Sequence, residues 1–185
     1  MKGFTRMETR FSLCGLNCDL CSMHLGGYCP GCGGGAGNQS CAIAKCSLEH
    51  GGISFCWECR EYPCPRYDGI DDWDSFVPHR SRQQDIAKVR ELGLEAYLAQ
   101  LGEKRAILDA LLARFNDGRR KTLFNTAVYL LPLEDLQSVM ADLNSRTELA
   151  GQSVKERALA AVELVQQAAD RRGVSLKLNK KPKKG

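Results

Sequence analysis

The sequence contains no long hydrophobic run and no apolar leader. Its longest apolar stretch, around Ala127–Leu131, is too short to cross a bilayer. The N-terminal segment MKGFTRMETRFSL is interrupted by charges and lacks the apolar core of a secretory signal. These absences predict a cytoplasmic protein that does not enter a membrane, in a compartment that keeps thiols reduced.

Cysteine is absent from the whole chain after Cys64, although the 185 residues include 10 cysteines. All of them fall in one N-terminal segment: Cys14, Cys18, Cys21, Cys29, Cys32, Cys41, Cys46, Cys56, Cys59 and Cys64. In a reducing compartment, clustered cysteines indicate metal ligands or redox groups rather than a set of disulfides. The end of this cluster is also the clearest domain boundary in the sequence.

The cysteine-rich segment has many glycines and few aliphatic residues, so it lacks the material for a hydrophobic core of its own. Metal coordination is the usual substitute in small units of this kind. We therefore expect a small irregular metal-stabilised cysteine-rich module, built from loops and turns, next to a mainly α-helical bundle. The expected organisation is a module at 1–67, an acidic connector at 68–80, a helical region at 81–173, and a disordered lysine-rich tail at 174–185.

Apolar residues at three- and four-residue intervals predict the helices of the second part. The expected segments are 83–91 with Gly93 as a stop, 94–115, 122–131, 134–143 after Pro132, and 153–173. The segment 122–131 is so apolar and rich in Val, Tyr and Phe that a strand stays possible. The last helix is the best marked, because Ser153 and Glu156 form a capping-box pattern and Gly173 suits its end.

The spacing Cys-x-x-Cys occurs three times, at Cys18/Cys21, Cys29/Cys32 and Cys56/Cys59. A two-residue turn can aim both thiolates at one ion, and two such turns complete the closed tetrahedral site typical of structural zinc. Soft thiolates also select copper(I) or iron–sulfur clusters over magnesium or calcium. The pattern favours zinc, as two ions, with all ten cysteines as candidate ligands.

Several assignments of ligands to ions fit the order of the cysteines. The sequential one places Cys18, Cys21, Cys29 and Cys32 on one ion and Cys41, Cys46, Cys56 and Cys59 on the other. Cys14 and Cys64 are then left over. A cross-braced arrangement that recruits Cys14 or Cys64 fits as well, and so does a cluster with bridging sulfurs. His24 and His50 could each replace a cysteine, but we expect them, like His79 outside the module, to be surface residues.

An iron–sulfur cluster is the alternative cofactor, in a redox or sensing role. The order Cys14-x-x-x-Cys18-x-x-Cys21 has the spacing of radical enzymes that use S-adenosylmethionine. Those enzymes continue with alternating strands and helices, whereas this chain continues with more cysteines and then helices. A thioredoxin-like role for Cys56 and Cys59 lacks the preceding βαβ pattern.

The cysteine motifs resemble those of a known family. They are CGLNCDLC at 14–21, CPGC at 29–32, then Cys41 and Cys46, and FCWECREYPC at 55–64. This order resembles the cysteine-rich bacterial and archaeal family called domain of unknown function 3795. The likeness extends through Pro78-His79-Arg80 and, more loosely, through Asp117-Gly118-Arg119 and Leu130-Leu131-Pro132-Leu133, to about residue 140. The resemblance implies zinc binding by the cysteines and no established activity.

No catalytic set can be recognised, which leaves an enzymatic role open but favours a non-enzymatic one. An all-cysteine spacing does not provide the open position of a catalytic zinc. Gly33–Gly35 lacks the Lys-Ser/Thr continuation of a phosphate loop. Asp71, Asp72 and Asp74 are expected to form an exposed acidic linker rather than a pair of catalytic acids.

The formal charge of +4 belongs to the tail, which holds Lys177, Lys180, Lys181, Lys183 and Lys184 and no acid. This tail and Arg119-Arg120-Lys121 make a nucleic-acid-binding zinc protein an alternative. The module itself has more acids than bases, and zinc–thiolate centres add negative charge, so it should repel phosphate. The sequence therefore predicts a structural zinc-binding protein with a protein partner. Metal storage or sensing by the surplus thiols is a further possibility.

Overall fold

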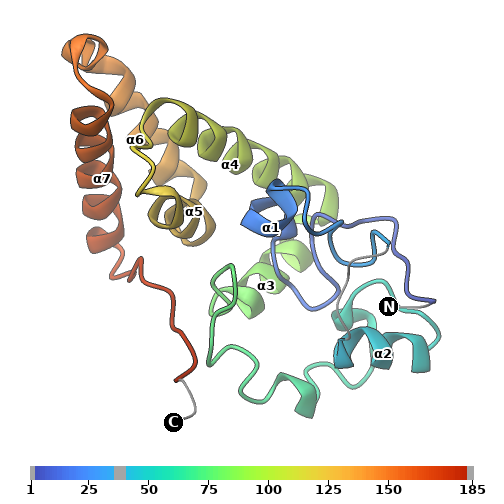
Figure 1. Cartoon of the computed structure of the whole chain (residues 1–185). Coiled ribbons are helices and arrows are strands. Elements are labelled where there is room, and N and C mark those ends of the chain that lie inside the picture. Colours follow the sequence, from blue (N-terminus) through green and yellow to red (C-terminus); the bar gives the residue numbers. More distant parts are fainter. Residues whose placement is uncertain (1–2, 36–40, 183–185) are drawn as a thin grey trace. The chain divides into compact units, whose positions relative to one another are not determined.

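The computed structural model describes residues 3–35 and 41–182, and in these residues the protein is mainly helical. Seven α-helices are present: α1 (Ser22–Leu25), α2 (Ala42–Glu49), α3 (Arg82–Leu92), α4 (Leu94–Arg114), α5 (Lys121–Leu130), α6 (Leu133–Ser145) and α7 (Val154–Arg171). Four 3-10 turns accompany them: η1 (Cys18–Leu20), η2 (Cys56–Glu58), η3 (Pro65–Tyr67) and η4 (Thr147–Gly151). The described chain forms no strand, and its order of helices can be followed in Figure 1.

The chain divides into two compact units. Unit 1 holds the described residues up to Ala99 together with 179–182, and unit 2 is Gln100–Leu178. The cysteine-rich segment, the connector and α3 all belong to unit 1, whereas α4 contributes its first turns to unit 1 and the rest to unit 2. The expected helical region 81–173 is thus shared between the units. None of the helices in the described residues is both long and apolar enough to cross a membrane.

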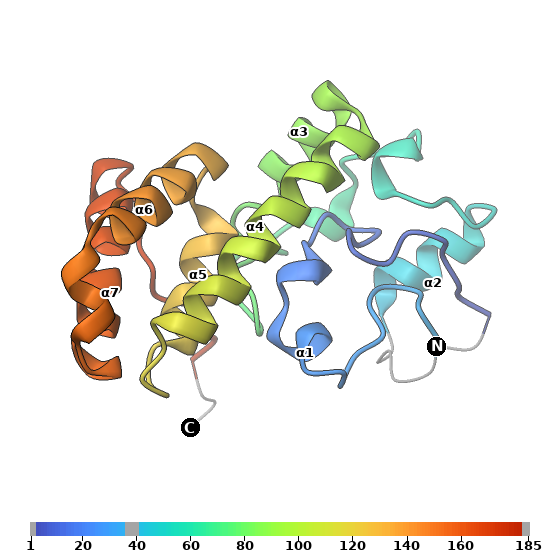
Figure 2. The same ribbon diagram turned by 90° about the horizontal axis from the view of Figure 1, so that it is seen from above.

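Unit 2 is a small helical bundle in which α7 packs against α5 and α6, side by side in Figure 2. Its core comes from apolar residues of these helices: Leu108, Leu111, Phe115, Phe124, Ala127, Val128, Leu131, Leu136, Val139, Leu143, Ala158, Ala161, Val165, Ala168 and Ala169. The segment 122–131 is a helix, which excludes the strand alternative. It is buried along most of its length, because the bundle surrounds it on several sides.

Local signals set the ends of these helices. α3 ends at Gly93, whose φ of 83° lies in the left-handed region that favours glycine. α7 begins at the predicted capping box: the Glu156 backbone N–H donates to Ser153 Oγ at 3.3 Å, and the Ser153 N–H donates to Glu156 Oε2 at 2.9 Å. α7 is followed by Gly173, again with positive φ.

Unit 1 differs from the expectation in two places. The cysteine-rich segment includes an eight-residue helix, α2, where only loops and turns were expected. The acidic connector is not wholly exposed: the Asp74 side chain is buried, whereas Asp72 is exposed. Asp74 accepts hydrogen bonds from the backbone N–H of His79 at 2.6 Å and of Asn179 at 2.7 Å, and pairs with Arg80 at 3.0 Å. These donors replace the water that an exposed carboxylate would keep.

The described part of the lysine-rich tail contains no helix or strand. Its residues nevertheless bond to the connector. The Asn179 carbonyl accepts from the Asp74 N–H at 2.7 Å, and Lys180 Nζ donates to the Ser75 carbonyl at 2.8 Å. Lys183 and Lys184 lie outside the described residues.

We expect Ser153→Ala to destabilise α7, because the substitution removes the hydroxyl that accepts the Glu156 N–H. Loss of such a cap costs about 1 kcal/mol. The matched control is Ser138→Ala, at an exposed position inside α6 where alanine is the better helix former. Urea unfolding followed by circular dichroism compares the two variants, and equal stability of both would show that the cap contributes nothing.

Candidate metal centres

The cysteines gather around two cavities in unit 1. The first cysteine group lines a cavity of about 220 Å³ and consists of Cys14, Cys18, Cys29, Cys32 and Cys41. The second cysteine group lines a cavity of about 30 Å³ and consists of Cys46, Cys56, Cys59 and Cys64. Cys21 lines neither cavity, but its thiol acts electrostatically on Cys18. None of the ten cysteines, all of which the structure describes, forms a disulfide.

Two of the three Cys-x-x-Cys pairs are built on 3-10 turns. The Cys21 N–H donates to the Cys18 carbonyl at 2.9 Å across η1, and the Cys59 N–H donates to the Cys56 carbonyl at 3.0 Å across η2. Each turn therefore starts at the first cysteine and ends at the second. This is the local geometry that the spacing predicted.

The third pair, Cys29 and Cys32, depends on glycines. A Cβ at Gly31 would lie 2.7 Å from the Thr9 carbonyl oxygen, and Gly31 has a φ of 84°. Any larger residue there would be strained by its backbone conformation, and its Cβ would collide with the neighbouring chain segment at Thr9. The glycine thus allows the Cys29–Cys32 loop to lie close to the N-terminal segment.

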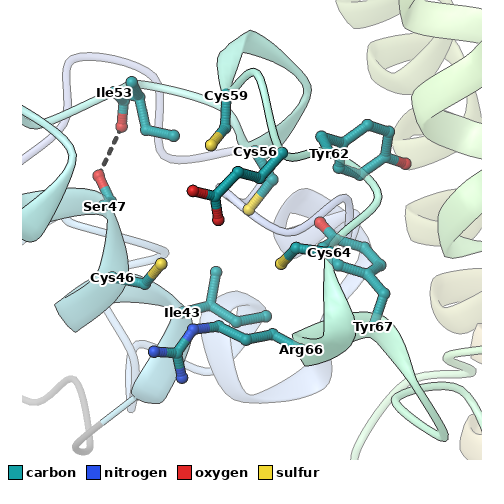
Figure 3. A pocket seen from close by; sticks show the side chains of 11 residues that line it. Ile43, Cys46, Ser47, Ile53, Cys56, Cys59, Tyr62, Cys64, Arg66 and Tyr67 are labelled. Atoms are coloured by element: carbon teal, nitrogen blue, oxygen red, sulfur yellow. Dashed lines mark hydrogen bonds between the residues drawn. The ribbon is translucent and has the colours of Figure 1, made fainter.

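The second cysteine group is the more sharply defined of the two. Its members come from three places in the chain: Cys46 lies in α2, Cys56 and Cys59 lie at the start of η2 and directly after it, and Cys64 directly precedes η3. In Figure 3 the four sulfur atoms face the middle of one pocket. A cavity needs only about 10–15 Å³ to hold a water molecule, so this one has room for a single small ion.

Burial raises the pKa of Cys56 in the second group to about 12, and the neighbouring thiols of Cys14, Cys64 and Cys46 raise it further, against a hydrogen bond with Tyr67. Burial also raises the pKa of Cys18, with the thiols of Cys32, Cys14 and Cys21 acting in the same direction. A divalent cation would reverse this balance, because a coordinated thiol is deprotonated.

The donor chemistry of both groups fits a thiophilic metal, since sulfur atoms are gathered while carboxylates and imidazoles are few. Among residues 3–35 and 41–182, no three Cys, His, Asp or Glu side chains are already arranged as the ligands of one ion. The two groups are therefore sets of thiols that share a cavity and are not yet placed as the ligands of one ion.

Arg6 lies beside the first cysteine group. Its guanidinium donates to the carbonyls of Ser54 at 2.9 Å, Phe11 at 3.0 Å and Cys32 at 3.2 Å, and it sits 4.7 Å from the centre of the Phe55 ring. Burial raises the pKa of Cys32, but the charge of Arg6 opposes this by favouring the thiolate. Arg6 Nη2 is buried without a hydrogen-bond partner in the described structure. A half-buried cation with one unused buried donor fits a neighbouring group that carries negative charge.

The structure groups the cysteines differently from the sequential assignment. Cys64, rather than Cys41, joins Cys46, Cys56 and Cys59, as in the cross-braced alternative. Cys41 lines the first cavity instead, at the start of α2 and five residues before Cys46. Helix α2 thus separates the two cysteines between the two cavities.

The three histidines are not among the residues that line the two cysteine cavities. His24 Nδ1 lies 2.8 Å from the Cys29 carbonyl oxygen, and the exposed His50 ring lies 3.5 Å from Cys46 Sγ. His79 is away from both groups and contacts Ser75 Oγ at 2.8 Å, while burial lowers its pKa. Neither His24 nor His50 lines a cysteine cavity.

A buried polar network that the sequence did not indicate supports the first group. Asn17, the residue before η1, donates from Nδ2 to Asp85 Oδ2 at 3.1 Å and accepts from the Tyr97 hydroxyl at 3.0 Å. Tyr67 donates to the Cys14 carbonyl at 3.3 Å. These partners lie 53 to 80 residues apart in sequence, so a short-range sequence pattern does not predict their contacts.

Comparison with known proteins gives no match to a family model, a curated protein or a solved structure. The resemblance of the cysteine motifs to domain of unknown function 3795 therefore stays a prediction.

We expect Tyr97→Phe to lower the free energy of unfolding by about 1–3 kcal/mol, since it leaves the buried Asn17 Oδ1 without this donor. Tyr28→Phe removes the same hydroxyl from an exposed side chain and is the matched control. Chemical denaturation measures both variants. If Tyr97→Phe is as stable as Tyr28→Phe, the network does not hold η1 in place.

Proposed function

We propose that this protein is a structural zinc-binding protein, in which two zinc ions fix the cysteine-rich part of unit 1 as a surface for a protein partner. The observation that carries the proposal is the meeting of Cys46, Cys56, Cys59 and Cys64 around one cavity of single-ion size. Four thiolates leave no position for a reactive water, so such a centre is structural rather than catalytic.

Zinc at the second cysteine group would cross-link three elements. It would join α2 to η2 and to the segment before η3. Burial raises the pKa of Cys56, so a thiolate there is unfavourable by itself, whereas a divalent ion stabilises several thiolates at once. The metal would thus act on stability and would take part in no reaction step.

The second ion is assigned to the first cysteine group. Cys14, Cys18 and Cys32 line the same cavity. Burial raises the pKa of Cys18 and of Cys32, and the Cys14 thiol acts in the same direction on both. Arg6 offsets part of the negative charge that their thiolates would bring. Arg6 Nη2 is buried without a hydrogen-bond partner in the described chain, and a zinc–thiolate centre beside it would supply negative charge for the guanidinium to balance.

A protein partner is supported by the exposed side chains of unit 1. Large apolar residues are exposed here: Met7, Tyr28, Leu48, Trp73 and Phe76. The cysteine segment is acidic on balance, and zinc–thiolate centres would make it more so. Aromatic and methionine side chains are favoured at protein interfaces, while an acidic surface disfavours nucleic acid.

An iron–sulfur cluster at the first cysteine group is the second candidate. The observation in its favour is the size of the cavity, about 220 Å³, with five cysteines around it. That space exceeds what one ion needs and could hold a cluster with its sulfides. The second cysteine group, with its smaller cavity, would still take zinc.

Metal analysis tests the proposal directly. Protein purified without oxygen and without a metal-binding tag should contain about two zinc ions per chain and show no visible absorption. A chelator that removes them should lower the thermal midpoint, because the cross-links are lost. Iron with acid-labile sulfide would instead establish the cluster, and full stability of the metal-free protein would refute a structural role.

Pairs of cysteine substitutions test which thiols share an ion. We expect the double variant Cys46→Ser/Cys64→Ser to contain one zinc ion fewer per chain than the unchanged protein. Each single variant should show the same loss, because both residues line the second cavity. Cys41→Ser with Cys64→Ser should lose up to two, since these cysteines line different cavities. Zinc per chain in each variant gives the answer, and loss of one ion by Cys41→Ser and Cys46→Ser together would restore the sequential assignment.

A further inference from the structure

Unit 2 contains a cavity that has no part in the cysteine chemistry. Its volume is about 150 Å³, and it lies where the ends of α4 and α6, the turn η4 and the first turn of α7 meet. Three arginines line it, Arg114, Arg146 and Arg157, together with the polar side chains of Asn144 and Thr147. No carboxylate is among the lining residues.

The three arginines are not used in ion pairs. In the described part of unit 2, the arginines that pair with acids are Arg105, Arg120 and Arg172. Arg114 is held in place by another contact, since its Nη1 donates to Asn144 Oδ1 at 2.9 Å and its guanidinium lies over the Phe115 ring. Within the described residues, the cavity thus gathers three positive charges that form no ion pair with a carboxylate.

Helix electrostatics explain two of these arginines but not the third. Arg114 is the last residue of α4 and Arg146 caps the end of α6, where a cation is favourable. Arg157 is the fourth residue of α7, near the positive end of that helix, where a cation is unfavourable. Its Nε is also buried without a hydrogen-bond partner within the described chain. A bound anion would relieve both costs.

We propose that this cavity binds the phosphoryl group of a phosphate monoester. Guanidinium groups donate paired hydrogen bonds that match phosphate oxygens, and three of them favour a dianion over a monoanion. The Thr147 hydroxyl and the Asn144 amide line the same cavity as further donors. The cavity exceeds the roughly 30 Å³ that one water occupies in the liquid, so a phosphoryl group has room. This site is independent of the metal proposal.

Titration of the whole protein as purified tests the site. Inorganic phosphate and methyl phosphate are the probes, at constant ionic strength in chloride, followed by calorimetry and phosphorus NMR. We expect saturable binding of one phosphate per chain. Arg157→Gln and Arg146→Gln should each weaken it by about tenfold or more, because each removes a charged donor. Arg171→Gln, which removes an exposed charge from the same helix, is the matched control and should bind as the unchanged protein does.

The other probes separate the alternatives. Dimethyl phosphate, a monoanion, should bind more weakly than methyl phosphate. Equal binding of acetate would overturn the assignment to phosphate, and tight binding of an oligonucleotide without binding of methyl phosphate would assign the arginines to a nucleic-acid backbone instead. An equal loss in Arg171→Gln and Arg157→Gln would show general charge attraction only. Circular dichroism checks folding, and two separate arginine variants keep the test decisive if one fails to fold.

Discussion

The buried amide of Asn17 is the contact on which the arrangement of unit 1 depends. It sits immediately before the turn η1 that carries Cys18, and it bonds at once to Asp85 of α3 and to Tyr97 at the start of α4. A buried polar group without a hydrogen-bond partner raises the free energy of the folded state. Moving the turn would break these hydrogen bonds, so the network holds the turn in one position. The place of Cys18 is thereby fixed by two helices that lie far from it in sequence.

Aromatic packing supplies what the cysteine segment lacks in aliphatic residues. The fully buried Phe11 ring lies 5.3 to 6.2 Å from the rings of Phe55, Trp57 and Tyr97, and the Arg6 guanidinium lies over the Phe55 ring. The segment therefore has part of a core, shared with α4. On the proposed function, metal would complete a framework that packing has already begun, rather than create one from a disordered chain.

A need for a ligand of opposite charge is common to both proposals. In unit 1 burial raises the pKa of Cys18 and of Cys56, with neighbouring thiols acting in the same direction, so their thiolates are unfavourable without a cation. In unit 2 three arginines line one cavity without an acid among them. Each arrangement is unfavourable by itself and favourable with a ligand of opposite charge. Each site is described within its own unit, so the two can be tested separately.

The sequence by itself determined the local features: the helices α3 to α7, the cap at Ser153, the stop at Gly93, and the turns within the pairs Cys18/Cys21 and Cys56/Cys59. These depend on periodicity, capping and short spacings. Only the tertiary structure decided that Cys64 joins Cys46, that Asp74 is buried, and which arginines share a cavity. Such groupings unite residues far apart in the chain. They follow from how the elements pack, which no short-range pattern encodes.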